Sequence, residues 1–401
     1  MFNVKKSIFL FEICLSMKIS ILSICFLHTL FGVFAALQPA AAQTINAEYE
    51  RFNATDTKYI HSGMALSPDK SLIALATTQS YPLYLYDINS RKVVRQFDVG
   101  NWYAGSRVTW SEGGRYLLIQ QLFYIDFASN KDREVNFEIV DALSGRSVLR
   151  FDKYHDVKIT PDEKYAVSLS GNKIEITDLQ NGKIVNSFSA DNATNSLCLS
   201  PDGKYIAISE RPGDQLLGQD PQFRKNKKGL KFTKKYKQVV SIYKTVDFSP
   251  VAIINEYYDN IYRLSWSPDG RFIFCLSIPH LKAATATSGR QNFISVIDAV
   301  RFQSTRTVFP SNSNYEPDFR LSNDGRSMGV VSWGKFPELR VHDFETGQVL
   351  QRFEMSSRTM EGISKLEIPS DGRVFIEFLP GDKSMLATFG NQLLLWHIPQ
   401  E

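Results

Sequence analysis

The stretch Leu197-Cys198-Leu199-Ser200-Pro201-Asp202-Gly203-Lys204-Tyr205-Ile206-Ala207-Ile208 places a four-residue turn between two apolar runs. Proline sets φ near the value that the second position of a type I turn requires, aspartate tolerates the third position, and glycine suits the fourth. The two apolar runs are therefore expected to pair as neighbouring strands of a hairpin.

This turn, or a variant of it, occurs seven times along the chain. The seven turns are Ser67-Pro68-Asp69, Ser111-Glu112-Gly113-Gly114, Thr160-Pro161-Asp162, Ser200-Pro201-Asp202-Gly203, Ser267-Pro268-Asp269-Gly270, Ser322-Asn323-Asp324-Gly325 and Leu379-Pro380-Gly381-Asp382. A third apolar run, a Gly- or Asn-containing turn and a fourth run generally follow. Four short strands in seven repeats predict an all-β fold, a single seven-bladed β-propeller with four antiparallel strands per blade.

The third strand of most units ends in aspartate. The endings read Tyr84-Leu85-Tyr86-Asp87, Glu138-Ile139-Val140-Asp141, Glu175-Ile176-Thr177-Asp178, Val296-Ile297-Asp298 and Arg340-Val341-His342-Asp343. On these endings and on the turns, the chain after residue 44 resembles WD40 and the related YVTN-type propeller repeats. The Trp-Asp pair of WD40 repeats is not intact in any unit, so the resemblance points to the bacterial WD40-like class rather than to eukaryotic scaffolds.

The two ends of the repeat region predict how the ring closes. The seventh unit has three strand-like runs and the chain stops at Glu401, before a fourth. A further strand-like run, Ile45 to Phe52, precedes the first unit. We expect this N-terminal strand to complete the last blade, which removes exposed strand edges.

Residues 1–42 have the features of a secretory signal peptide. Lysines precede an apolar stretch from Ile19 to Leu37, and small residues then predict cleavage before Gln43. An uncleaved membrane anchor is the alternative, and Met17 is an alternative start. We expect a mature chain, 43–401, without a transmembrane segment, located in the periplasm or secreted. Its cysteines, Cys198 and Cys275, are expected to be buried free thiols, with a disulfide as the alternative.

Long insertions are expected on one face of the ring. The links between second and third strands are long at 121–136, 211–238 and 279–292, and these links open onto the face opposite the Ser-Pro-Asp-Gly turns. Clustered insertions often mark a binding face, although surface decoration is the alternative. The insertion 211–238 alone carries a net charge of +7, more than the +4 of the whole chain.

The predicted binding residues lie in links on this face. They are the aromatic residues Trp102, Tyr103 and Trp333 and the basic residues Arg224, Lys225, Lys227, Lys228, Lys234 and Lys235. Trp102 and Tyr103 belong to the link between the first and second units, and the others belong to links between second and third strands. A basic run attracts anions. Because the export signal argues against nucleic acid, we expect the partner to be a protein or an anionic envelope component. The alternatives are a solvated basic loop that binds nothing and aromatic side chains that pack against neighbouring loops.

No motif predicts catalytic residues, a metal site or a cofactor. The histidines are scattered singly, and His61 and His155 lie just before inner strands, where a structural role is expected. A non-catalytic, monomeric binding platform is therefore the favoured function. The alternative is a propeller-type enzyme, lactonase-like or quinoprotein-dehydrogenase-like, with its site at the central channel. Four residues are expected to line that channel, namely Lys158, Arg263, Arg320 and Glu377; they are mostly basic and suit an anion or water.

Overall fold

The computed structural model describes residues 48–79, 82–100, 102–122, 134–190, 192–279, 291–313, 316–333, 336–355 and 373–399. The predicted signal peptide 1–42 and the cleavage site before Gln43 lie outside these residues. Parts of the links 121–136 and 279–292, and most of the link that follows β25, also lie outside them. The repeat region, 44–401, forms one compact unit.

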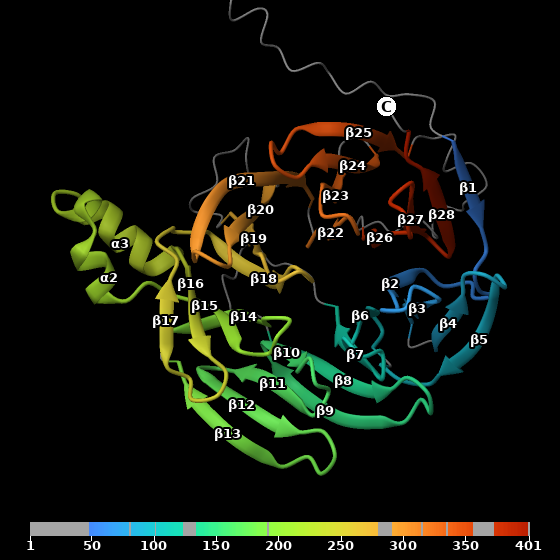
Figure 1. The fold of residues 1–401 in the computed structure, drawn as a ribbon, viewed down its shortest axis with the longest axis horizontal. Helices are drawn as coiled ribbons and strands as arrows, with labels where there is room; N and C mark the ends of the chain where they lie inside the picture. Colours follow the sequence, from blue (N-terminus) through green and yellow to red (C-terminus); the bar gives the residue numbers. More distant parts are fainter. Residues whose placement is uncertain are drawn as a thin grey trace, which may run out of the picture. The chain divides into compact units, whose positions relative to one another are not determined.

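Seven four-stranded antiparallel sheets are arranged in a ring, which confirms the predicted seven-bladed β-propeller (Figure 1). Blades are numbered along the chain, and their strands are given from the centre outward. Blade one has β2 (His61–Leu66), β3 (Leu72–Thr77), β4 (Leu83–Asp87) and β5 (Lys92–Phe97); blade two has β6 (Ser106–Trp110), β7 (Tyr116–Gln121), β8 (Val135–Asp141) and β9 (Ser147–Tyr154); blade three has β10 (Asp156–Ile159), β11 (Tyr165–Ser170), β12 (Lys173–Asp178) and β13 (Ile184–Ser189).

The remaining blades follow the same order. Blade four has β14 (Ala193–Leu199), β15 (Tyr205–Glu210), β16 (Val239–Lys244) and β17 (Pro250–Ile253); blade five has β18 (Asn260–Trp266), β19 (Phe272–Ile278), β20 (Gln291–Asp298) and β21 (Gln303–Asn312); blade six has β22 (Phe319–Leu321), β23 (Ser327–Trp333), β24 (Pro337–Asp343) and β25 (Val349–Glu354); blade seven has β26 (Ile376–Phe378), β27 (Ser384–Phe389), β28 (Gln392–His397) and β1 (Tyr49–Phe52).

The ring closes as the sequence predicts. Strand β1 pairs antiparallel with β28, so the last blade joins the two ends of the repeat region. The register runs from Tyr49 opposite Trp396 to Phe52 opposite Leu393. Strand β28 is therefore an inner member of its sheet rather than an exposed edge.

The Ser-Pro-Asp-Gly turns are held by a recurrent set of hydrogen bonds. In blade four the Ser200 hydroxyl donates to Asp202 at 2.6 Å, and the Tyr205 amide donates back to the Ser200 hydroxyl at 2.9 Å. The fourth turn position is left-handed, with φ of 70° at Gly203, and in blades one and three the non-glycine residues Lys70 and Glu163 take this conformation. The repeated sequence thus encodes a local turn that sets the register of each inner hairpin.

Apolar layers between neighbouring blades form the core. Leu75 and Tyr84 of blade one, for example, belong to the cluster between blades seven and one, whereas Leu85, Val108 and Leu117 belong to the cluster between blades one and two. The second strand of a blade, such as β15 or β19, is covered on both faces, which explains its nearly continuous apolar sequence. The free thiols of Cys198 and Cys275 are buried, as predicted, in the layer between blades four and five.

The insertion 211–238 is helical, a feature that the sequence analysis did not anticipate. It contains α2 (Asp214–Gln219), the short 3-10 helix η1 (Pro221–Phe223) and α3 (Lys227–Tyr236). Buried Leu217, Phe223 and Thr233 face its interior. The Tyr257 hydroxyl, in the link to blade five, donates to Asp220 at 2.9 Å and fixes the insertion to the ring. Figure 1 shows α2 and α3 projecting beyond the ring beside blades four and five.

Candidate functional site

The central channel contains a cavity of about 550 Å³ that all seven inner strands line. It extends to the turns that follow the inner strands, where Pro68, Lys70, Glu112, Pro161 and Pro268 form its mouth. It therefore opens on the face of the Ser-Pro-Asp-Gly turns, opposite the face that the long insertions predict for binding. Its size is typical of small-molecule sites.

The alternation of side chains along the inner strands decides which residues face the cavity. Residues two and four positions before each turn point to the same side of a strand. The residues two positions before the turn that line it include Ala65, Thr109, Lys158, Cys198, Ser265, Arg320 and Glu377; those four positions before it include Arg107, Asp156 and Arg263. The four residues that the sequence predicts at the channel, Lys158, Arg263, Arg320 and Glu377, all lie there.

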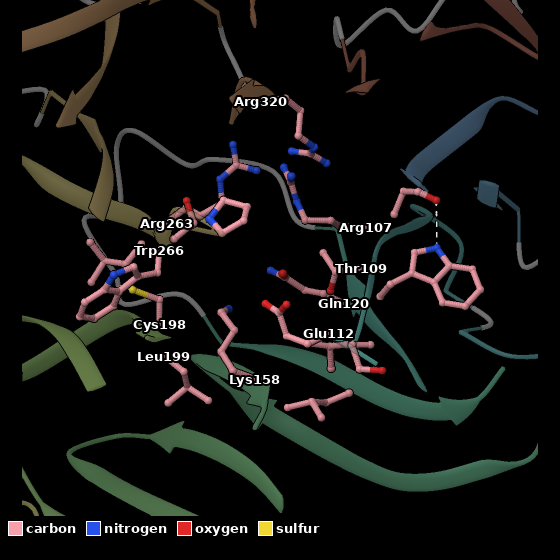
Figure 2. Close-up of a pocket in the computed structure, with 18 of the residues that line it drawn as sticks. Arg107, Thr109, Glu112, Gln120, Lys158, Cys198, Leu199, Arg263, Trp266 and Arg320 are labelled. Carbon is pink, nitrogen blue, oxygen red and sulfur yellow. Dashed lines mark hydrogen bonds between the residues drawn. The ribbon is translucent and has the colours of Figure 1, made fainter. Parts of the chain in front are cut away.

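The inner end of the cavity holds an ion-pair cluster around Asp318. One carboxylate oxygen of Asp318 accepts hydrogen bonds from Arg107 at 3.1 Å, Arg263 at 3.2 Å and Arg320 at 2.8 Å. Figure 2 shows the three guanidinium groups converging from different walls. Arg107 belongs to blade two and Asp318 to blade six, so this contact crosses the channel.

Two further carboxylates neutralise the cluster. Glu316 lies 3.3 Å from Arg107 and 3.6 Å from Arg263, and Glu377 lies 3.0 Å from Arg320. Three arginines thus face three carboxylates, and Lys158 is paired with Asp156. The base of the channel is consequently close to neutral rather than mostly basic. Glu316, Asp318 and Asp156, which supply the balancing charge, were not among the residues predicted at the channel.

The pKa values follow from burial and pairing. Burial alone would raise the pKa of Asp318, but the charges of Arg320, Arg107 and Arg263 together lower it to about 2. Burial and the nearby charge of Arg107 lower the pKa of Arg263 to about 10. Burial raises the pKa of Glu377, against the opposing effect of Arg320. At neutral pH the Asp318 carboxylate is ionised.

The acidic residues four positions before a turn also join neighbouring blades. The second oxygen of Asp318 accepts the Ile376 amide of blade seven at 3.0 Å. Asp156 accepts the Leu197 amide of blade four at 3.0 Å, and the Ser196 hydroxyl accepts the Leu264 amide of blade five at 2.9 Å. These polar residues have a structural role, because each satisfies the backbone of the next inner strand.

Blade two contributes a different kind of polar wall. Arg107 lies opposite Gln120, and Thr109 opposite Leu118, in the pairing of β6 with β7, so all four side chains face the cavity. Thr109 is exposed and Gln120 half-buried. Neither side chain has a hydrogen-bond partner among the described residues, in contrast to the ion-paired arginines. Figure 2 shows both beside Glu112 and facing Lys158.

The structure distributes the predicted binding residues over several blades. Trp102 and Tyr103 lie in the link between β5 and β6, where Trp102 packs against the apolar cluster of blades one and two while Tyr103 is 72 % exposed. Trp333 ends β23 in blade six and is half-buried. The basic residues lie in the blade-four insertion. These residues therefore do not form one site.

The basic residues of the insertion do form a shared surface. Those that the structure leaves exposed are Arg224, Lys225, Lys227, Lys228, Lys231, Lys234 and Lys235. Lys234 pairs with Asp214, and Lys235 lies 5.3 Å from the centre of the Tyr236 ring. Within the described part of the chain, no acidic side chain is within ion-pair distance of the other five.

His61 and His155, for which the sequence predicts a structural role, lie in the interior. His61 is completely buried at the start of β2, and burial lowers its pKa to about 4, so it is neutral at pH 7. His155 is buried next to β10. Across the described ranges, no three His, Cys, Asp or Glu side chains are grouped as a metal site.

The comparisons with known proteins add no identification. No protein-family model matches the chain, and no curated protein matches it significantly in sequence. Among the described residues, no helix is long and apolar enough to cross a membrane.

Proposed function

We propose that the protein is a non-catalytic binding propeller of the bacterial WD40-like or YVTN-type class that docks onto anionic lipid headgroups of the cell envelope. The observation that carries this proposal is the basic surface of the insertion, defined by Arg224, Lys225, Lys227, Lys228 and Lys231. The N-terminal signal-like segment supports export to the periplasm. The turn repeats support the WD40-like class.

The positions of the lysines on α3 favour a role in binding. The partial positive charge at a helix N-terminus disfavours nearby cations. Lys227 and Lys228 nevertheless occupy the first turn of α3, which contains no acidic residue. Local choices that reduce stability are expected at functional sites. A negatively charged surface next to this end of α3 would relieve the repulsion.

The insertion also has a preformed helix and aromatic side chains, both of which suit contact with a charged bilayer. The Asn226 side chain accepts the Gly229 amide at 2.8 Å and caps α3, so the helix is defined before any partner binds. Phe232 and Tyr236 are in ring contact at 5.1 Å and add apolar area beside the lysines. A basic helix with aromatic residues is typical of interfacial membrane contacts.

Neutralising this surface tests the proposal. The variant Lys225→Gln, Lys227→Gln, Lys228→Gln, Lys231→Gln should bind vesicles of anionic phospholipid roughly 100-fold or more weakly, because each lysine near such a surface contributes about 1 kcal/mol. Co-sedimentation with anionic and with zwitterionic vesicles measures the effect. Wild-type binding should weaken as salt is raised.

A matched control removes the same charge elsewhere. Lys58, Lys92, Arg146 and Lys183 are exposed on blades one to three and have no described acidic partner. Changing these four residues to glutamine should leave vesicle binding close to wild type. The proposal would be contradicted if the wild-type protein did not bind anionic vesicles, or if the insertion variant bound them as well as the control does.

A further inference from the structure

We propose that the central cavity is a binding site for a neutral, polyhydroxylated ligand, a mono- or disaccharide, that enters from the face of the Ser-Pro-Asp-Gly turns. This site is distinct from the basic insertion. It also lies on the opposite face from the long links of the propeller. The proposal rests on the position of the cavity, its charge balance and its free hydrogen-bonding groups.

The cavity extends from the turns at its mouth to the Asp318 ion-pair cluster at its inner end. Turn residues of five blades line its mouth, namely Pro68, Ser111, Pro161, Ser200 and Pro268. At the inner end, the Arg107 side chain reaches across to Asp318 and its guanidinium lies 5.1 Å from the centre of the Phe375 ring. The result is a cup whose base is built from ion pairs and whose rim is built from rigid turns.

The charge balance of the cup favours a neutral ligand. At the base of the cup, the cations Arg107, Arg263, Arg320 and Lys158 each have a carboxylate partner. Lys70 and Glu112, which carry opposite charges, lie at the mouth. At the base, an anionic ligand would have to displace Glu316 or Glu377 from an arginine, and a cationic ligand would have to displace an arginine or Lys158 from its carboxylate. A neutral ligand requires neither change, so the paired base can remain intact.

The free polar groups of the cup suit hydroxyl groups. The Thr109 hydroxyl and the Gln120 amide both donate and accept, and the Glu112 carboxylate accepts. All three belong to blade two and line the cavity without a described hydrogen-bond partner. Ser265 adds a hydroxyl from blade five. A sugar hydroxyl also donates and accepts, so one ring can satisfy several of these groups at once.

Apolar side chains between the polar groups suit the carbon faces of a sugar ring. Leu66, Leu118, Leu199 and Phe319 line the cavity from four different blades. Their hydrophobic surface excludes water around the hydrogen bonds and increases their strength. The cavity therefore combines apolar side chains with polar groups that can orient a ligand, as small-molecule sites do.

Titration with neutral sugars tests this inference. Purified full-length protein is titrated by calorimetry with a panel of neutral monosaccharides and disaccharides, with sodium citrate and calcium chloride as charged comparisons. Saturable binding of at least one sugar with a 1:1 ratio is expected. That binding should change little with salt concentration, because no ion pair forms or breaks.

Two cavity variants and one control locate the site. Gln120→Leu and Thr109→Val each remove hydrogen-bonding groups with little change of volume, and each should weaken sugar binding at least about tenfold. Gln96→Leu makes the same change on the exposed outer strand β5 and should leave binding unchanged. Thermal unfolding verifies that each variant is folded. If Gln120→Leu does not fold, Thr109→Val alone tests the site.

Three results would overturn the inference. The first is that no sugar of the panel binds at millimolar concentration. The second is that a sugar binds equally well to wild type and to both cavity variants, which would place it elsewhere. The third is salt-sensitive binding of citrate or calcium in the cavity with no sugar bound, which would make the ligand an ion.

Discussion

At the scale of single residues, Glu163 shows how the repeat tolerates a missing aspartate. Blade two has Gly113 where most turns have Asp, and the Ser111 hydroxyl instead donates to Glu163 of blade three at 2.5 Å. The Arg115 amide donates to the same oxygen at 3.1 Å. These bonds match those that Asp202 accepts from Ser200 and from the Lys204 amide in its own turn. Blade three thus supplies the carboxylate that blade two lacks.

This substitution predicts a rescue. Glu163→Ala should lower the melting temperature by about 2–5 °C, since it removes hydrogen bonds worth ~1 kcal/mol each. Gly113→Asp should restore most of the loss in that background, because it recreates the usual turn. Differential scanning calorimetry of the single and double variants measures both changes.

Gly113→Asp in the wild-type background is the control for this rescue. A Cβ atom at Gly113 would lie 2.7 Å from a carboxylate oxygen of Glu163. Gly113→Asp alone should therefore destabilise the protein, and also bring two carboxylates together. A double variant no more stable than Glu163→Ala alone would show that the carboxylate is not what holds this turn.

At the scale of secondary-structure elements, β1 stabilises the ring from outside the seven repeats. It covers the edge of β28 through four residue pairs. Phe52 packs on the cluster that also contains buried Ala54, Met64 and Leu393. The strand therefore contributes both backbone hydrogen bonds and apolar burial, and it links the first repeat to the last.

Removing this strand should open the last blade. Deletion of residues 44–56 is expected to lower the melting temperature by roughly 10 °C or more, since several buried apolar side chains and a strand pairing are lost together. The exposed edge of β28 should also promote association, which size-exclusion chromatography would detect. Addition of a peptide spanning 44–56 should recover part of the stability. A soluble monomer with unchanged melting temperature would exclude the closing role of β1.

At the scale of the whole molecule, the fold could be predicted from local turn chemistry. The charge of the channel was harder to predict, because it depends on ion pairs between residues far apart in the sequence. The turns and the strand order depend on residues close in sequence, so the repeat predicts seven blades and the closing strand. Arg107 and Asp318 are 211 residues apart and meet only because the ring closes. Arg107 and Asp156 could have been found by counting four residues back from each turn. The sequence alone does not show that their charges would be paired.

Other features depend on tertiary context. The Lys-rich segment of α3 has high charge, and its few apolar residues recur at helical spacing. It forms a helix where Phe223 and Leu217 provide a small core. The position of Trp102 in a link predicts a side chain that is available for binding. In the structure, Trp102 instead packs against the cluster between blades one and two. The predicted docking partner and the periplasmic location remain predictions.

The Asp318 cluster joins blades two, five, six and seven, so its loss should destabilise the whole propeller. Asp318→Asn leaves three guanidinium groups facing two carboxylates in a buried site. Removing one partner of a buried ion pair typically costs ~3–5 kcal/mol. We therefore expect the melting temperature at pH 7 to fall by about 10 °C.

The pH dependence separates this charge effect from a packing defect. The pKa of Asp318 is about 2 in the folded protein, against about 3.9 in an unfolded chain. A lowered carboxyl pKa stabilises the fold above the unfolded pKa and loses that effect as pH falls through the folded pKa. The difference in melting temperature between wild type and Asp318→Asn should thus be largest above about pH 5 and shrink between pH 4 and pH 2.

Asp202 also has a pKa lowered to about 2, chiefly by its hydrogen bond from Ser200, but its side chain is 48 % exposed. Asp202→Asn should therefore show the same trend with a much smaller amplitude, because solvent screens that carboxylate. A difference for Asp318→Asn that stays constant down to pH 2 would assign the destabilisation to packing instead of to the ion pairs across the channel.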